Sequence, residues 1–119
     1  MNKQDIYEKI VSWEQDHGES FLDRFDGYLR AGSFMFWALG RGYIDQERFA
    51  LWEVDYASNE LEADDANYYI MNDEVPYALV DLAPGDYDEE KYEKAYGIVA
   101  EFISESTVYL KRFDEFLNE

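Results

Sequence analysis

Apolar residues near the start of the chain recur at separations of three and four residues, which is typical of one face of a helix. This stripe consists of Ile6, Tyr7, Ile10, Val11 and Trp13. The pattern predicts an amphipathic helix over residues 4–16. We expect the helix to end at Gly18, because glycine readily adopts the left-handed conformation that follows many helices.

Shorter apolar stretches follow. Ser20 is a candidate N-cap for a second helix, which carries Asp23 in its first turn. A third short helix is expected from Ser33 through Leu39, and Asp45 has the residue type of an N-cap for the next one. The apolar face predicted for the second helix consists of Phe21, Leu22, Phe25, Tyr28 and Leu29.

Residues 68–82 fit two structures. Two short apolar runs, 69–71 and 78–80, flank Asn72 and Pro76, an arrangement found in β-hairpins and also at helix ends. We favour a short β-hairpin. The sequence Ala-Pro-Gly-Asp then predicts a break at residues 83–86.

The longest periodic segment runs from Asp88 to Asn118 and predicts one long C-terminal helix. Residues 104–107 are where it is expected to weaken or bend. Acids in its first turn, with Lys111 and Arg112 near its end, match the helix dipole. The predicted fold class is a helix-dominated α+β fold. It has several amphipathic helices, a long C-terminal helix and a short β-hairpin around residues 68–82, all in a single compact acidic domain spanning residues 1–119.

Composition supports a folded protein. The chain of 119 residues is 47% hydrophobic and 18% aromatic, whereas acidic disordered chains contain few aromatics. It contains no Cys, which excludes disulfides and thiolate nucleophiles. Its start lacks the basic and apolar regions of a signal peptide, and no stretch approaches the roughly 18 apolar residues of a membrane span. We therefore expect a cytoplasmic protein.

Charge is the most unusual property of the chain. The formal net charge is −18, and the 42 residues from Phe49 to Glu90 contain thirteen carboxylates and no Lys, Arg or His. An ordinary surface mixes both signs, since like charges repel and opposite charges pair. We predict a partner-binding acidic surface made of these thirteen carboxylates and the next one in the chain. Its members are Glu53, Asp55, Glu60, Glu62, Asp64, Asp65, Asp73, Glu74, Asp81, Asp86, Asp88, Glu89, Glu90 and Glu93.

Few residues suggest catalysis or metal binding. His17 is the single imidazole and lies at a predicted helix end, where histidine commonly caps carbonyls. Asp86, Asp88 and Glu90 fit alternate positions of an EF-hand loop. The sixth position of that loop would hold Lys instead of Gly, and the twelfth Gly instead of Glu, so the loop geometry fails. We expect a protein that is not an enzyme and needs no metal or cofactor.

The basic-free stretch approaches the charge density of DNA. If wholly helical, it would be about 63 Å long and carry a charge every ~5 Å, against about 3.4 Å per phosphate along one DNA strand. Such a protein repels nucleic acid and attracts the proteins that bind it. A halophilic or merely very soluble protein would instead spread its acids evenly.

In size, acidity, aromatic content and the basic-free stretch ending Asp-Tyr-Asp-Glu-Glu at residues 86–90, the chain resembles the small acidic bacterial DNA-mimic proteins. Among them it is most similar to the kind whose partner is the histone-like nucleoid protein HU. The resemblance implies a monomeric, non-enzymatic protein that occupies the DNA-binding face of such a basic protein. Two alternatives remain: a phage or plasmid anti-restriction or anti-CRISPR mimic, and an immunity protein against a basic toxin.

Overall fold

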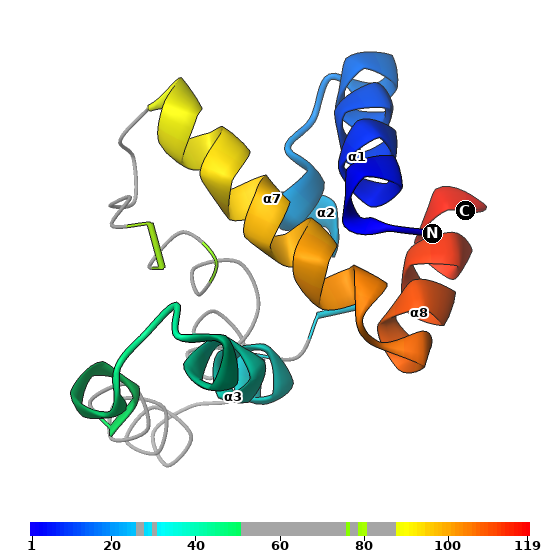
Figure 1. Ribbon diagram of the computed structural model, residues 1–119. Helices are drawn as coiled ribbons and strands as arrows, with labels where there is room; N and C mark the ends of the chain where they lie inside the picture. Colours follow the sequence, from blue (N-terminus) through cyan, green and yellow to red (C-terminus); the bar gives the residue numbers. More distant parts are fainter. Residues whose placement is uncertain (26–27, 30, 51–75, 77–78, 81–87) are drawn as a thin grey trace, which may run out of the picture.

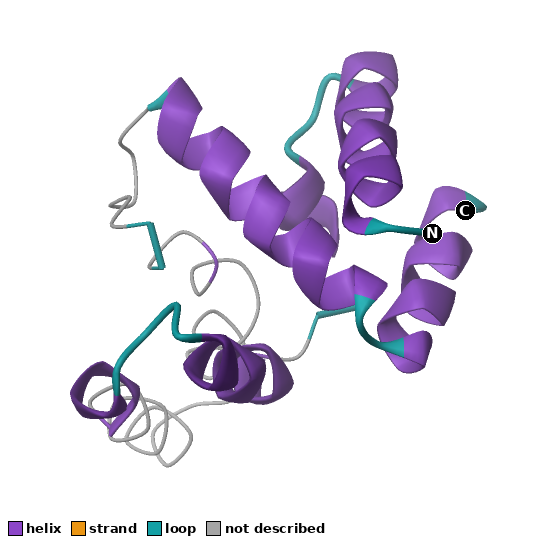
Figure 2. Cartoon of the chain, in the orientation of Figure 1, coloured by secondary structure: helices purple, strands orange, loops and turns teal. Residues whose placement is uncertain are grey.

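Helices joined by turns make up the described part of the protein (Figures 1 and 2). The computed structural model describes residues 1–25, 28–29, 31–50, 76, 79–80 and 88–119. Residues 46–50 are helical, with the Asp45 side chain accepting the Arg48 N–H at 2.7 Å as the predicted N-cap. The other helices are α1 (Lys3–His17), α2 (Phe21–Phe25), α3 (Ala31–Arg41), α7 (Glu89–Ser104) and α8 (Thr107–Leu117).

The predicted α+β class is wrong, although the expectation of a helix-dominated chain is confirmed. None of the described residues lies in a strand. Of the hairpin predicted at residues 68–82, only Pro76, Leu79 and Val80 are described; Pro76 is helical and the other two lie in a turn. Leu79 and Val80 are adjacent and both buried, whereas neighbours on a strand with one solvated face point to opposite sides. The rest of the predicted hairpin lies outside the described residues.

The predicted first helix is confirmed as α1. The Asn2 side chain accepts the Asp5 N–H at 2.9 Å at its start. At its end Gly18 has a φ of 67°, and its N–H donates to the Glu14 carbonyl. His17 has a structural role there, since its Nδ1 donates to the Trp13 carbonyl at 2.8 Å and its ring stacks on the Trp13 ring.

The predicted C-terminal helix is two helices, which meet at a sharp angle (Figure 1). The Ser104 hydroxyl donates to the Glu101 carbonyl at 2.7 Å. The Ser106 side chain then accepts the Tyr109 N–H and caps α8. Serine favours such local bonds over a continuous helix. Because apolar residues keep helical spacing on both sides of the break, periodicity predicted a bend at most.

An aromatic cluster holds α2 against the C-terminal part of the chain. The Phe21 ring centroid lies 4.9 Å from that of Phe25, 5.9 Å from Phe113 and 5.3 Å from Phe116. The contacts to α8 are edge-to-face, a geometry that adds about 0.5–1.5 kcal/mol per pair beyond area burial. A helix of five residues is too short to be stable alone, so these contacts keep α2 in place.

We expect alanine substitutions at two glycines, Gly18 and Gly97, to change the stability of the protein in opposite directions. A Cβ at Gly18 or Gly97 would meet nothing within 4 Å, so only backbone conformation distinguishes them. We expect Gly18→Ala to lower the free energy of unfolding by about 1–2 kcal/mol, because alanine is strained at positive φ. Gly97→Ala, inside α7, should raise it by up to about 1 kcal/mol. Urea denaturation followed by circular dichroism measures both, and changes of the same sign would contradict the backbone assignment.

Candidate functional site

Four members of the predicted acidic surface lie in the described part of the chain. They are Asp88, Glu89, Glu90 and Glu93, and all four are exposed at the start of α7. The other ten lie outside the described residues: Glu53, Asp55, Glu60, Glu62, Asp64, Asp65, Asp73, Glu74, Asp81 and Asp86. The structure therefore places the end of the basic-free stretch, together with Glu93, on one helix.

The acids at the start of α7 have a local structural reason. Asp88 is the N-cap, and its side chain accepts the Lys91 N–H at 3.2 Å. Glu89 and Glu90 occupy the first turn, where the helix dipole favours negative charge by about 0.3–1 kcal/mol each. These charges are thus stabilised by their own helix, and their side chains still face solvent.

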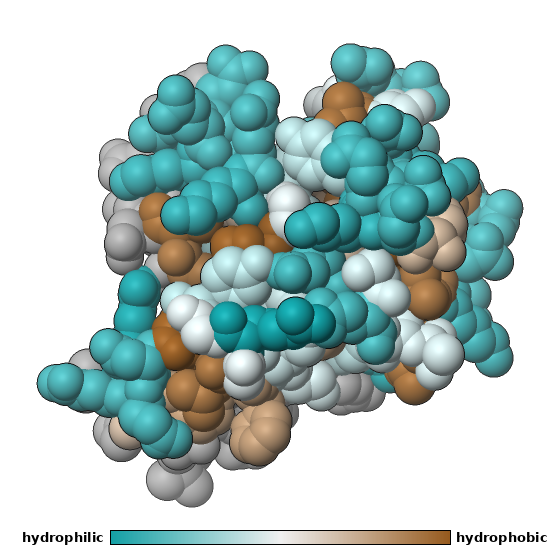
Figure 3. All heavy atoms as spheres, viewed as in Figure 1, coloured by the Kyte–Doolittle hydropathy of each residue, from teal (hydrophilic) through white to brown (hydrophobic). Residues whose placement is uncertain are grey.

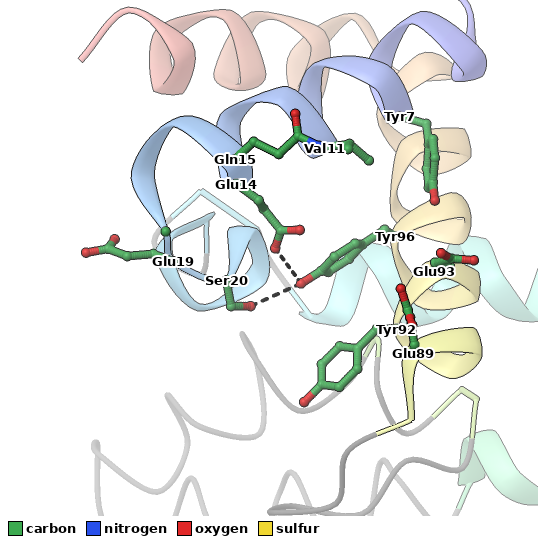
Figure 4. A pocket seen from close by; sticks show the side chains of 11 residues that line it. Tyr7, Val11, Glu14, Gln15, Glu19, Ser20, Glu89, Tyr92, Glu93 and Tyr96 are labelled. Carbon is green, nitrogen blue, oxygen red and sulfur yellow. Dashed lines mark hydrogen bonds between the residues drawn. The ribbon is translucent and has the colours of Figure 1, made fainter.

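A cleft lies between α1 and the first half of α7 (Figure 4). Its volume is about 540 Å³. In the space-filling view a notch separates these two helices, and mostly hydrophilic residues form its rims (Figure 3). No Lys or Arg is among the described residues that line the cleft. Its tyrosines and carboxylates are Tyr7, Tyr92, Tyr96, Glu14, Glu19, Glu89 and Glu93.

Glu14 joins three helices at the cleft. Its Oε2 accepts the hydroxyl of Tyr96 at 2.7 Å and the backbone N–H of Phe21 at 2.8 Å. The Tyr96 hydroxyl also lies 3.2 Å from Oγ of Ser20, and both interactions of this hydroxyl are drawn in Figure 4. The Glu14 carboxylate therefore pairs the first N–H of α2 and holds the Tyr96 side chain in place. Its role is structural.

The remaining carboxylates of the cleft differ in what neutralises them. Glu19 forms an exposed ion pair with Arg24 at 3.4 Å, and in Figure 4 its carboxylate points away from Tyr96. Within the described structure, Glu89 and Glu93 take part in no ion pair. The uncompensated negative charge of the cleft therefore lies on its α7 side.

The pKa of the Tyr7 phenol is affected by this negative charge. Tyr7 reaches from α1 toward Glu93 on α7 (Figure 4). Burial raises its pKa above the usual 10.0, and the negative charges of Glu93 and Glu14 raise it further. The same negative charges that disfavour the ionised phenol would attract a cation placed in the cleft.

Sequence reasoning missed the cleft. It assigned Tyr7 to an apolar helix face, included Tyr92 and Tyr96 only as apolar positions of the periodic segment from Asp88 to Asn118, and did not single out Glu14. One signal was present: Tyr92 and Tyr96 are four residues apart, and so are Glu89 and Glu93, which places a tyrosine stripe beside an acidic stripe on one helix. Which helix would pack against those stripes was not encoded locally.

Other kinds of site find no support in the described residues. The described residues contain no group of three or more His, Asp or Glu side chains arranged to hold a metal ion. None of the described helices combines the length and apolar character needed to cross a bilayer. No protein-family model, curated protein or solved structure matches the chain.

The field in the cleft predicts a shift in the titration of Tyr7. Because folding favours the neutral phenol, its contribution to stability is complete below pH 10.0 and is lost as the pH rises through the raised pKa. We expect Glu93→Gln to lower the pKa of Tyr7 toward the usual value. ¹³Cζ-tyrosine NMR measures this titration, and Tyr7→Phe assigns the signal.

The matched control for this titration is Glu8→Gln, on the neighbouring residue of α1. Glu8 is exposed and is not among the groups that raise the pKa of Tyr7. Equal shifts in the two variants would mean that the net charge of the whole protein, and not the cleft, sets this pKa.

Proposed function

We propose that this protein is a DNA mimic, which binds the DNA-binding face of a basic DNA-binding protein and blocks or regulates its association with DNA. The preferred target is the histone-like protein HU. The observation that carries the proposal is the segregation of charge: residues 49–90 hold thirteen carboxylates and no base, in a chain whose net charge is −18.

The acidic start of α7 supports the proposal. Asp88 and Glu93 are five residues apart, so the four carboxylates between and including them span about 7.5 Å of helix axis. Lys91 lies among them, so the net charge of residues 88–93 is −3. One net charge per about 2.5 Å is comparable with one phosphate per about 3.4 Å of a DNA strand. Carboxylates carried on a formed helix also lose less conformational entropy on binding than those on an unfolded chain.

One base of α7, Lys94, is not among the described residues that line the cleft. Lys94 lines a second cavity of about 410 Å³ together with Lys3 and Tyr43. Glu89 and Glu93 line the cleft, whose described lining contains no base. A basic partner that reaches the cleft therefore meets carboxylates and none of the described bases, and this attraction is strongest at low salt because dissolved ions screen it.

The direct test is displacement of DNA. A fluorescent DNA duplex bound to purified HU should be released by this protein at about 50 mM salt, and the effect should fall steeply as salt rises, because it depends on screened charges. Fluorescence anisotropy measures the release. A restriction endonuclease, a CRISPR nuclease and a basic nuclease toxin serve as parallel targets that separate the alternatives. No release from any of them at low salt would refute mimicry.

Charge-neutralising variants locate the surface. We expect D88N/E89Q/E90Q to inhibit at least about tenfold more weakly than wild type, a change of about 1.4 kcal/mol in binding. Asn at position 88 retains N-capping, so α7 should remain formed, which circular dichroism checks.

The control for this triple variant is D114N/E115Q/E119Q, which removes the same charge from exposed residues at the end of the chain. We expect it to inhibit nearly as well as wild type. Equal losses in the two triple variants would assign the effect to net charge and not to the acidic start of α7.

A further inference from the structure

We propose that the cleft between α1 and α7 receives an arginine side chain of the basic partner. The proposal rests on the function proposed above and adds a specific contact to it. A mimic of charge alone would attract any basic surface, whereas a built recess for one side chain selects among such surfaces.

The charge of the cleft fits a cation. Glu89 and Glu93 line it from α7 and, among the described residues, neither forms an ion pair. Glu14 is held at the opposite wall by Tyr96 and Phe21. Burial raises the pKa of Tyr7, and the charges of Glu93 and Glu14, one from each wall, raise it further. A guanidinium entering the cleft would therefore gain attraction from both walls.

The aromatic walls favour a guanidinium over an ammonium. The rings of Tyr92 and Tyr96 lie 6.3 Å apart at 53°, and the Tyr96 hydroxyl is tied to Glu14. Tyr7 adds a third ring from α1 (Figure 4). Guanidinium is planar and weakly hydrated, so it stacks on aromatic faces and pairs with carboxylates in a bidentate way, while ammonium is compact and strongly hydrated.

The protein itself contains such a contact. The Arg112 guanidinium carbon lies 4.9 Å from the Tyr109 ring centroid, and its Nη1 donates to the Tyr28 carbonyl at 3.2 Å. A tyrosine ring and an oxygen acceptor thus hold a guanidinium in this fold. The cleft presents the same two elements, and the described residues that line it supply no cation of their own.

The size of the cleft fits a side chain that enters from a partner. Its volume of about 540 Å³ is within the usual range of roughly 300–1,000 Å³ for ligand pockets. An extended arginine with the adjoining backbone of a loop would occupy such a space more fully than an isolated ion. The acids at the start of α7 then lie beside the entrance and face the rest of the partner.

A small probe tests the recess without the partner. N-acetyl-arginine methylamide, titrated into the full-length protein, should shift the ring signals of Tyr7 and Tyr92 in ¹³C-tyrosine NMR. The lysine counterpart should bind several-fold more weakly, since cation–π stacking of a guanidinium is lost. Shifts spread over many tyrosines, or equal binding of the two probes, would overturn the proposal.

Variants of the cleft separate stacking from charge. We expect Tyr92→Leu and Glu93→Gln each to weaken binding of the arginine probe by about five- to tenfold, while Tyr92→Phe retains it because the ring remains. Glu115→Gln removes one charge from an exposed position on α8 and should have little effect on binding of the arginine probe. Urea denaturation confirms that each variant is folded. If Tyr92→Phe fails as Tyr92→Leu does, ring stacking is not the contact.

The HU displacement assay distinguishes failure of the cleft from failure of mimicry. If Y92L/E93Q releases DNA from HU as well as wild type does, while D88N/E89Q/E90Q does not, mimicry stands and the arginine recess is wrong. If wild type releases no DNA from any basic target, both proposals fall. Loss of release in Y92L/E93Q, with release retained in E115Q, supports both.

Discussion

The half-buried carboxylate of Glu14 is the interaction on which the arrangement of α1, α2 and α7 depends. It accepts the Tyr96 hydroxyl, 82 residues away in the chain, and the first N–H of α2. Charge-assisted hydrogen bonds of this kind are roughly twice as strong as neutral ones. Without this acceptor the Phe21 N–H would lose its hydrogen bond, at a cost of about 1–3 kcal/mol, and the Tyr96 hydroxyl would lose the shorter of its two contacts.

Aromatic packing offsets the repulsion that a net charge of −18 imposes on the compact state. Phe21, Phe25 and Phe113 are fully buried, and their rings meet those of neighbouring helices. The core therefore allows the surface to remain acidic. Charges that the helices themselves favour, such as those at the start of α7, oppose folding least.

The proposed mimicry and the proposed arginine recess both depend on helix α7, the first through long-range attraction and the second through short-range contacts. At long range, a one-signed surface attracts a basic protein and accelerates its approach. At short range, tyrosine rings and carboxylates select a planar cation. Both depend on α7, whose first turn carries the exposed acids and whose next turns carry Tyr92 and Tyr96. Glu14 connects this helix to α1 and so shapes the recess.

Local sequence determined the features that depend on a few neighbouring residues. The helix from residue 4 to 16, its end at Gly18 and the cap at Asp45 follow from apolar periodicity and short-range hydrogen bonds. The same reasoning predicted strands that no described residue forms, because short apolar runs fit a hairpin and helix ends alike.

The break between α7 and α8 comes from local hydrogen bonds of Ser104 and Ser106, whereas tertiary structure alone decided the cleft. The cleft lies between α1 and α7, which Glu14 and Tyr96 join across 82 residues, and no local pattern encodes which helices pack together. The composition determined that the protein is acidic and folded. Packing decided which tyrosines and carboxylates share one space, because that depends on contacts between segments far apart in the chain.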